Sequence, residues 1–312
     1  MSHPAPLLNV ISRLDGYGGA RLLRYFAAHQ ARAGRAPRVA ALAADPQIVR
    51  ELREAGVDVA VLAARWGADP VALGRLARLR RQDERRRVVA WDLRAWCYAR
   101  CAARGEPATV AALPATPLDP PPAISREAAL AELQLPADAR VIAVVGPLTP
   151  RKQVDEAIWA YELVRVLHAD ARLVVFGDGP DRHRLERYAT LVSEPGCVRF
   201  AGYRADLPAL LPHVDVYWQL DPSASTPYGL LEAMAAARPV VASHVPAHRA
   251  ALAGGHGGSL VARGDRAGVA RATDLLLQDA AAAQRLGAAA RAMVERSWSL
   301  ATRLAELDAW LR

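Results

Sequence analysis

The sequence predicts an α/β protein with two doubly wound lobes, each built on a parallel sheet. Short apolar strands alternate with helical segments through both halves of the 312-residue chain, which is typical of parallel strands joined by right-handed crossovers. Between the halves, residues 113–123 (LPATPLDPPPA) contain five prolines and fit neither a helix nor a central strand. We interpret this segment as an interdomain linker.

The first half contains five candidate strands, and helices are expected between them. The strands are expected at residues 7–12, 38–43, 57–63, 88–91 and 109–113. The helices are expected at residues 20–33, 47–55 and 71–86. Gly34 is placed to end the first helix, because glycine readily adopts the left-handed conformation found after helix C-termini.

The second half repeats the alternation. Ser125 is expected to cap a helix, and strands are expected to begin at Val141, Leu173, Val198, Val214, Val240 and Ser259. A final helix is expected over residues 299–311, where four leucines recur at helical spacing. The predicted domains are therefore residues 1–122, residues 123–296 and a C-terminal helix within residues 297–312.

Composition excludes several classes of protein. No run of eighteen apolar residues occurs, so we expect no membrane-spanning helix. The N-terminus does not read as a secretory signal, and three cysteines do not form a disulfide framework, so a cytoplasmic location is expected. Cys97 and Cys101 lie four residues apart on an expected helix, which is too few ligands for a metal site.

The most informative stretch runs from Val214 to His244 and reads as strand, loop, helix and strand. The helix is expected to open at Gly229 and to stop before Pro239. Ligands of open parallel sheets bind beyond the carboxyl ends of the strands, and a helix N-terminus there attracts phosphate. Glu232, one turn inside this helix, can accept hydrogen bonds from vicinal hydroxyls such as those of a ribose. The alternative for Glu232 is a solvated glutamate favoured by the helix dipole.

This stretch resembles the donor-binding segment of family-4 (group 1) retaining glycosyltransferases, which have the GT-B fold of two Rossmann-like lobes with a cleft between them. The matching residues are 232–235 (EAMA) and 239–241 (PVV). Three further segments resemble the family in the same order, namely 141–152 (VIAVVGPLTPRK), 173–180 (LVVFGDGP) and 198–203 (VRFAGY). The resemblance covers roughly residues 140–312 well and 1–60 loosely, and four motifs in order form a specific signal.

The resemblance implies roles for individual residues. Lys152, the single lysine of a chain with net charge +8, stands where the family places a phosphate-binding lysine, and Glu232 stands where it binds ribose. These two are the candidate catalytic residues. The candidate donor-binding residues are Gly18, Gly19, Arg151, Gly177, Gly179, Tyr203, Thr226, Gly229 and Leu230. For the glycine loop a plain tight turn is the alternative, and Asp178 is interpreted as a turn and cap residue.

The implied reaction is sugar transfer from a nucleotide-diphosphate donor, a UDP- or GDP-sugar, to a glycan, lipid or small-molecule acceptor that the sequence does not identify. The resemblance implies no metal and no cofactor besides the sugar nucleotide. In relatives, a C-terminal helix such as residues 297–312 crosses back to the first lobe. The sequence gives no motif for binding nucleic acid.

The chain also departs from the family. The acid expected eight residues before Glu232 falls on Ala224, or on Thr226 if the loop is two residues shorter. Pro147 stands where an arginine is usual, and Ala237 stands where a glycine ends the helix. The first lobe is short. These departures motivate a second hypothesis, a catalytically weak or inactive nucleotide-sugar-binding protein, and a third, a nucleotide-sugar epimerase of the same fold.

A basic segment lies in the first half. Arginines at positions 75, 78, 80, 81 and 85–87 alternate with leucines at 73, 76 and 79. One interpretation is a crossover helix with a solvated arginine face. The other is a basic amphipathic helix that contacts an anionic membrane, which would place the protein peripherally at the inner face of that membrane.

Overall fold

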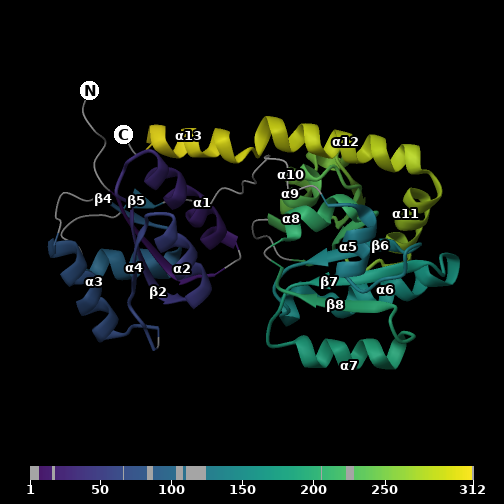
Figure 1. The fold of residues 1–312 in the computed structure, drawn as a ribbon, viewed down its shortest axis with the longest axis horizontal. Coiled ribbons are helices and arrows are strands. Elements are labelled where there is room, and N and C mark those ends of the chain that lie inside the picture. Colours follow the sequence, from purple (N-terminus) through teal and green to yellow (C-terminus); the bar gives the residue numbers. More distant parts are fainter. Residues whose placement is uncertain are drawn as a thin grey trace. The chain divides into compact units, whose positions relative to one another are not determined.

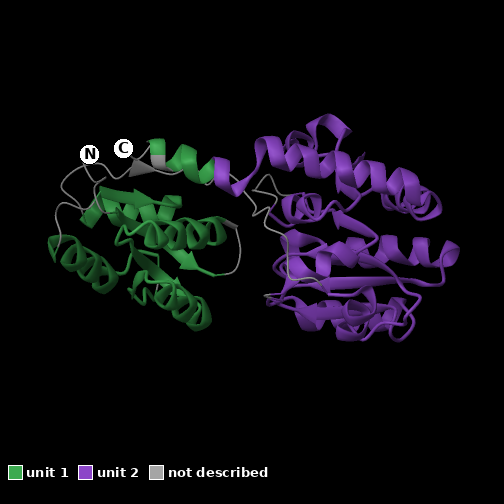
Figure 2. Cartoon of the chain, turned by 45° about the horizontal axis from the view of Figure 1, so that its top comes forward, with its two compact units in different colours: residues 1–114, 303–312 green, residues 115–302 purple. Residues whose placement is uncertain are grey.

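The computed structural model describes residues 7–15, 18–65, 67–82, 87–102, 108–109, 124–204, 206–222 and 228–310. The chain divides into two compact units, one of residues 1–114 and 303–312 and the other of residues 115–302 (Figure 2). Each unit contains a parallel sheet flanked by helices (Figure 1). The predicted α/β class with two parallel sheets is therefore confirmed.

The sheet of unit 1 has the strand order β3-β2-β1-β4-β5, and all of its pairs are parallel. Its strands are β1 (Leu7–Leu14), β2 (Arg38–Ala44), β3 (Asp58–Val61), β4 (Arg87–Ala90) and β5 (Ala108–Thr109). Its helices are α1 (Gly18–Arg32), α2 (Pro46–Glu54), α3 (Pro70–Gln82) and α4 (Leu93–Ala102). The expected linker at residues 113–123 and the expected end of the third helix at residues 83–86 lie outside the described residues.

Local signals explain the helix ends. Gly34 has φ +72°, and its N–H donates to the carbonyl of Ala31, so its predicted role at the end of α1 is confirmed. Asp45 caps α2 by accepting from the N–H of Gln47 at 2.8 Å. Ser125 accepts from the N–H of Ala128 at 3.1 Å, which confirms the predicted cap of α5 (Arg126–Glu132).

The sheet of unit 2 has the strand order β11-β10-β9-β6-β7-β8, again wholly parallel. Its strands are β6 (Arg140–Val145), β7 (Ala171–Phe176), β8 (Val198–Gly202), β9 (Val216–Gln219), β10 (Val240–Ser243) and β11 (Ser259–Val261). Its α-helices after α5 are α6 (Val154–Leu167), α7 (Arg182–Val192), α8 (Leu207–Leu210), α9 (Tyr228–Ala235), α10 (Pro246–Ala251), α11 (Arg266–Gln278) and α12 (Ala280–Ser297). Three 3₁₀ turns, η1 (Pro150–Lys152), η2 (Leu211–His213) and η3 (Ala253–Gly255), complete it, and α13 (Leu300–Trp310) follows α12.

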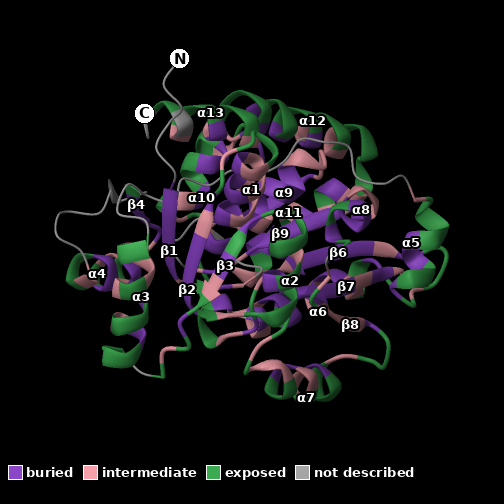
Figure 3. Cartoon of the chain, turned by 60° about the vertical axis from the view of Figure 1, so that its left-hand side comes forward, coloured by how far each residue is buried: buried purple, intermediate pink, exposed green. Residues whose placement is uncertain are grey.

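Both faces of the second sheet are buried, as its apolar strands require. Val141 and Ala143 of β6 belong to a core with α5, α9 and α12, whereas Ile142 and Val144 belong to a second core with α6, α7 and α11. Strands β6, β7, β9 and β10 are accordingly largely buried, the edge strands β8 and β11 are half-buried, and the outer helix faces are exposed (Figure 3). The sheet is thus a rigid layer whose polar residues can gather only at its strand ends.

Helix α9 ends in a strained turn. Ala237 has φ +54°, which lies in the left-handed region. This conformation is the one expected at a position where the family has a helix-ending glycine. An L-residue there costs roughly 1–2 kcal/mol relative to the right-handed form. The turn packs closely on α12, where a Cβ at Gly287 would lie 2.1 Å from the carbonyl oxygen of Ala237.

We predict that Ala237→Gly raises the free energy of unfolding by about 0.5–1 kcal/mol, because relief of strain exceeds the added entropy of the unfolded chain. The melting temperature should rise by roughly 2 °C. The matched control is Ala236→Gly, whose φ is not in the left-handed region and which should be neutral or destabilising. Equal effects of the two variants in thermal unfolding would contradict the strain.

Candidate functional site

The strand order of unit 2 creates a natural binding position. The chain runs outward from β6 to β7 and β8 and then returns to β9 on the other side of β6. In open parallel sheets, ligands bind beyond the carboxyl ends of the strands at such a reversal, because the two neighbouring loops leave in opposite directions. The residues that follow β6 and β9 therefore form the candidate site.

A buried lysine lies at this reversal. Lys152 ends η1, is only 8% exposed, and places its Nζ 3.4 Å from Oδ2 of Asp221, two residues after β9. Gly146, the residue after β6, leaves room for it: its φ is +147°, and a Cβ there would lie 2.7 Å from Cε of Lys152. The glycine therefore lets the lysine side chain lie against the strand end.

Among the described residues, Lys152, Gln219 and His248 converge on the carboxylate of Asp221. Lys152 faces Oδ2, while Nε2 of Gln219 donates to Oδ1 at 3.0 Å and Nε2 of His248 lies 3.2 Å from Oδ1. Burial would raise the pKa of Asp221, but the His248 hydrogen bond, the Lys152 charge and the Gln219 hydrogen bond together lower it from 3.8 to about 2. Asp221 is therefore an anion at neutral pH.

The same contacts act on the lysine. Burial lowers the pKa of the Lys152 ammonium, whereas the charge of Asp221 and the hydrogen bond to it raise that pKa. The net direction is downward. Asp221 is thus the partner that opposes loss of the lysine's proton.

His248 on α10 fixes the far side of the carboxylate. The ring is 1% exposed, and its Nδ1 lies 3.0 Å from the carbonyl oxygen of Ser243, the last residue of β10. The hydroxyl of Ser243 in turn donates to the carbonyl of Leu220 at 2.8 Å. These bonds tie the loop after β9 to the end of β10.

A second chain of contacts leads towards α9. The hydroxyl of Tyr217 donates to Oε1 of Gln219 at 2.7 Å. Burial and the negative charges of Asp221 and Glu232 raise the pKa of Tyr217, so this hydroxyl keeps its proton and orients Gln219. A Cβ at Gly229 would lie 2.6 Å from the Tyr217 oxygen, so the first turn of α9 sits directly on this hydroxyl. Glu232 is buried on the same helix.

The glycines after β7 have a packing role. A Cβ at Gly177 would lie 1.9 Å from the carbonyl oxygen of Gly146, and one at Gly179 would lie 2.3 Å from that of Leu148. The loops after β6 and β7 therefore touch backbone to backbone. Asp178 accepts from the N–H of Gly179 at 2.7 Å, as a turn residue does, but the N-cap position of α7 is occupied by Asp181, whose side chain makes no capping hydrogen bond.

The other predicted residues are dispersed. Arg151 is exposed beside Lys152, Tyr203 is 42% exposed after β8, and Leu230 is fully buried in α9. Gly18 and Gly19 begin α1 in unit 1, and Thr226 lies outside the described residues, as does Ala224. Unit 2 thus brings together Lys152, Gly229 and Glu232 around residues that the sequence analysis did not single out.

Those missed residues are Tyr217, Gln219, Asp221 and His248. A usable signal was present for Asp221, which is a carboxylate directly after a buried strand at an expected ligand position. No comparable signal marked His248, which lies 27 residues later and reaches Asp221 only because β10 pairs with β9.

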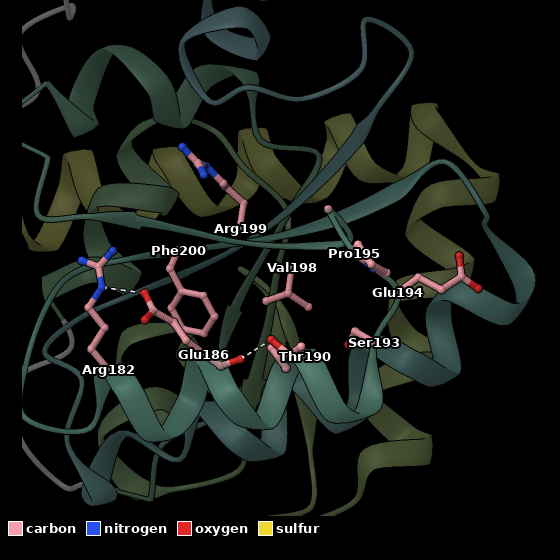
Figure 4. A pocket seen from close by; sticks show the side chains of 11 residues that line it. Arg182, Glu186, Thr190, Ser193, Glu194, Pro195, Val198, Arg199 and Phe200 are labelled. Carbon is pink, nitrogen blue, oxygen red and sulfur yellow. Dashed lines mark hydrogen bonds and ion pairs between the residues drawn. The ribbon is translucent and has the colours of Figure 1, made fainter.

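A separate groove of about 340 Å³ lies between α7 and the edge strand β8 (Figure 4). Its lining includes Arg182, Glu186 and Phe200, and Arg182 is already paired with Glu186 at 2.7 Å. No predicted site residue lines it. We therefore place the candidate site at the strand reversal and not in this groove.

Residues 139–279 match the family described as "Glycosyl transferases group 1". A lipopolysaccharide core biosynthesis glycosyltransferase, LpsE of Rhizobium meliloti (strain 1021), is 33% identical over 151 residues, which are 48% of this chain and 43% of LpsE. A D-inositol 3-phosphate glycosyltransferase of Stackebrandtia nassauensis is 35% identical over 186 residues, which are 55% of this chain and 42% of that protein. The match thus spans less than half the length of these relatives.

Solved structures resemble the whole chain. Anabaena HepE, in complex with UDP and glucose, has a TM-score of 0.82 and 14% identity, covering 98% of this chain and 99% of HepE. WaaG, a glycosyltransferase involved in lipopolysaccharide biosynthesis, has a TM-score of 0.74 and 16% identity, covering 96% of this chain and 99% of WaaG. At these identities the likeness establishes the fold, which is the predicted GT-B architecture of two Rossmann-like domains.

The charge of Asp221 should contribute to stability in a pH-dependent way. Its folded-state pKa is lowered from 3.8 to about 2, so the contribution is present above the unfolded value and is lost as the pH falls towards 2. Asp221→Asn should therefore lower the free energy of unfolding by about 2 kcal/mol at pH 7 and by roughly half as much at pH 3. Urea unfolding at both pH values measures this.

The matched control for this measurement is Asp138→Asn, because Asp138 is exposed in the turn before β6. The control should show no comparable loss at either pH. A loss in Asp221→Asn that is the same at pH 7 and pH 3 would assign the effect to packing rather than to charge.

Proposed function

We propose, from the group 1 glycosyltransferase match of residues 139–279 and the GT-B fold, that the chain is a family-4 retaining glycosyltransferase. Unit 2 would bind a nucleotide-diphosphate sugar, and the acceptor would bind to the N-terminal lobe. The single observation that carries the proposal is the buried ammonium of Lys152 at the strand reversal. The division into residues 1–122, 123–296 and a returning helix at 297–312 remains part of this proposal.

The geometry suits a diphosphate flanked by a ribose. A lysine ammonium is a compact point charge with three donors, which fits phosphate oxygens. The N-terminal turn of α9, which Gly229 brings against Tyr217, supplies the positive end of a helix dipole. Glu232 would accept hydrogen bonds from the ribose hydroxyls, and backbone beside Tyr203 would contact the base.

In the proposed reaction an acceptor hydroxyl oxygen bonds to the anomeric carbon of the donor sugar while the bond from that carbon to the diphosphate oxygen breaks. The electron pair leaves with the diphosphate, and the acceptor's proton passes to a phosphate oxygen. Attack on the face that the diphosphate leaves retains the anomeric configuration. Lys152 would stabilise the negative charge that develops on the leaving group, which is an electrostatic role.

UDP- and GDP-sugars are both proposed donors, and the acceptor is proposed only as a glycan, lipid or small molecule. HepE was solved with UDP and glucose, so UDP and UDP-glucose are the first probes. The departures at residues 147 and 224–226 keep a second candidate, a nucleotide-sugar-binding protein with weak or no activity. Donor binding without release of the nucleoside diphosphate would favour that candidate.

Lys152→Ala should weaken UDP or GDP binding at least tenfold and reduce donor turnover by roughly 10²–10³-fold, because it removes charge stabilisation of the leaving diphosphate. Glu232→Gln should weaken binding of the nucleotide while leaving the diphosphate contact in place. Calorimetric titration and nucleoside diphosphate release from UDP- and GDP-sugars measure the two effects.

The matched control for Glu232→Gln is Glu127→Gln, since Glu127 is exposed in the first turn of α5. The anomer of the free sugar first released to water reports retention. Unchanged nucleotide binding and turnover in Lys152→Ala would refute the phosphate assignment.

We also propose peripheral contact with an anionic membrane through α3 and α4 of unit 1, at the inner face of that membrane. These helices carry arginines and no acidic residue, and their exposed arginines are Arg75, Arg78, Arg81, Arg94 and Arg100. Exposed Val71 and Leu93 add apolar surface at the start of each helix. None of the helices among the described residues is long and apolar enough to span a membrane.

The triple variant Arg78→Gln, Arg81→Gln, Arg94→Gln should bind vesicles containing anionic lipid roughly a hundredfold more weakly, because each basic residue near such a surface contributes about 1 kcal/mol. Cosedimentation with phosphatidylglycerol vesicles measures this. The control removes three exposed arginines of unit 2, Arg187, Arg263 and Arg296. Equal loss in both triple variants would show that net charge, and not the α3–α4 surface, drives binding.

A further inference from the structure

The contacts of Asp221 suggest a role for a residue that the proposed reaction does not use. Its carboxylate lies between two buried basic side chains, with Lys152 Nζ 3.4 Å from Oδ2 and His248 Nε2 3.2 Å from Oδ1. Gln219 adds a third donor at 3.0 Å. Because His248 and Gln219 hold Oδ1, the other oxygen, Oδ2, is fixed in the direction of the lysine.

We propose that Asp221 is a positioning residue that holds Lys152 at the strand reversal and keeps it protonated, so that the lysine meets an incoming diphosphate already charged. The diphosphate in this statement rests on the proposed function, whereas the action of Asp221 on Lys152 does not. Asp221 itself is buried and touches no reacting atom in this scheme.

The need for such a residue follows from burial. An ammonium removed from water favours its neutral form unless an anion lies close to it. Lys152 is paired with Asp221 after β9, and exposed Arg151 precedes it on η1. His248 on α10 contacts Asp221, Tyr217 on β9 donates to Gln219, and the charge of Glu232 on α9 acts on Tyr217. Asp221 is the carboxylate paired with the lysine, and its charge works against the lowering of the lysine's pKa by burial.

The long Lys152–Asp221 contact leaves the lysine available. A separation of 3.4 Å exceeds the usual length of a charge-assisted N–H···O bond, which is about 2.7–2.9 Å. Two of the three ammonium protons are not needed for this contact. The lysine can therefore bond to phosphate oxygens without releasing Asp221.

His248 holds Asp221 in place when the lysine side chain moves towards a ligand. Its Nδ1 faces the carbonyl oxygen of Ser243 at 3.0 Å, and its Nε2 faces Asp221. Through these two contacts the buried ring ties Asp221 to the end of β10.

The chain offers an unusually direct test, because Lys152 is its single lysine. The 312-residue protein labelled with ¹³C,¹⁵N-lysine gives one lysine side-chain signal, and the ¹³Cε chemical shift reports its protonation as the pH is raised. In Asp221→Asn the titration midpoint should fall by about one pH unit or more relative to the unaltered protein. Asp138→Asn is the matched control and should leave the midpoint unchanged.

Binding gives a second readout. Between the two midpoints, Asp221→Asn should bind UDP and GDP at least tenfold more weakly than the unaltered protein, and lowering the pH should restore the affinity. A merely structural role would weaken binding equally at all pH values. An unchanged lysine midpoint in folded Asp221→Asn would overturn the proposal.

If Asp221→Asn fails to fold, NMR spectra of the unaltered protein test the proposal instead. A slowly exchanging Lys152 ammonium signal with cross-peaks to the β-protons of Asp221 supports the proposal, and an ammonium without those cross-peaks overturns it. The test of nucleotide binding is independent of the test of Asp221. If neither UDP nor GDP changes the lysine chemical shift in the unaltered protein, the proposed donor site is wrong, while the pH titration still tests the role of Asp221.

Discussion

The ion pair between Lys152 and Asp221 is the constraint on which the organisation of unit 2 depends. Burying two charges costs several kcal/mol per ion unless each is paired and hydrogen-bonded. The two residues meet beyond the carboxyl ends of the strands, because the loops after β6 and β9 bring them together there. His248 and Gln219 supply the additional hydrogen bonds that such a carboxylate requires.

The glycines around this pair are explained by space. Gly146 must lack a side chain for the lysine, and Gly229 must lack one for the hydroxyl of Tyr217. Gly177 and Gly179 allow the loop after β7 to press its backbone against the loop after β6. A Gly-rich turn at a strand end is commonly interpreted as a place where a ligand approaches the backbone, yet all four of these glycines lie against the protein's own atoms.

The sequence predicted the fold well because its signals are local. Apolar runs mark strands buried on both faces, and the caps at Ser125 and Gly34 depend only on neighbouring residues. The positive φ of Ala237 was also foreseeable, since a helix must turn there before β10. Lys152 and Glu232 were found through their place in motifs.

Asp221, Gln219 and His248 could not be assembled in the same way. Their contacts depend on which strands are neighbours and on register, since Val240 of β10 lies opposite Tyr217 of β9. Only that alignment brings His248 of α10 beside Asp221, two residues after β9. A sequence pattern identifies strand ends one at a time, whereas the site is a property of three adjacent strand ends.

The composition gives a further reason to see Lys152 as a requirement of the site. The chain has 40 basic lysine and arginine residues, and this is its single lysine, so arginine is its ordinary cation. A guanidinium is planar and carries five donors, so it needs more space than an ammonium. It also remains charged in any protein environment and needs no neighbouring anion to stay protonated. The space beside Gly146 is narrow, and the compact ammonium that fits there can lose its proton when buried. A lysine at this position therefore makes a neighbouring carboxylate necessary, and Asp221 is the residue that meets that need.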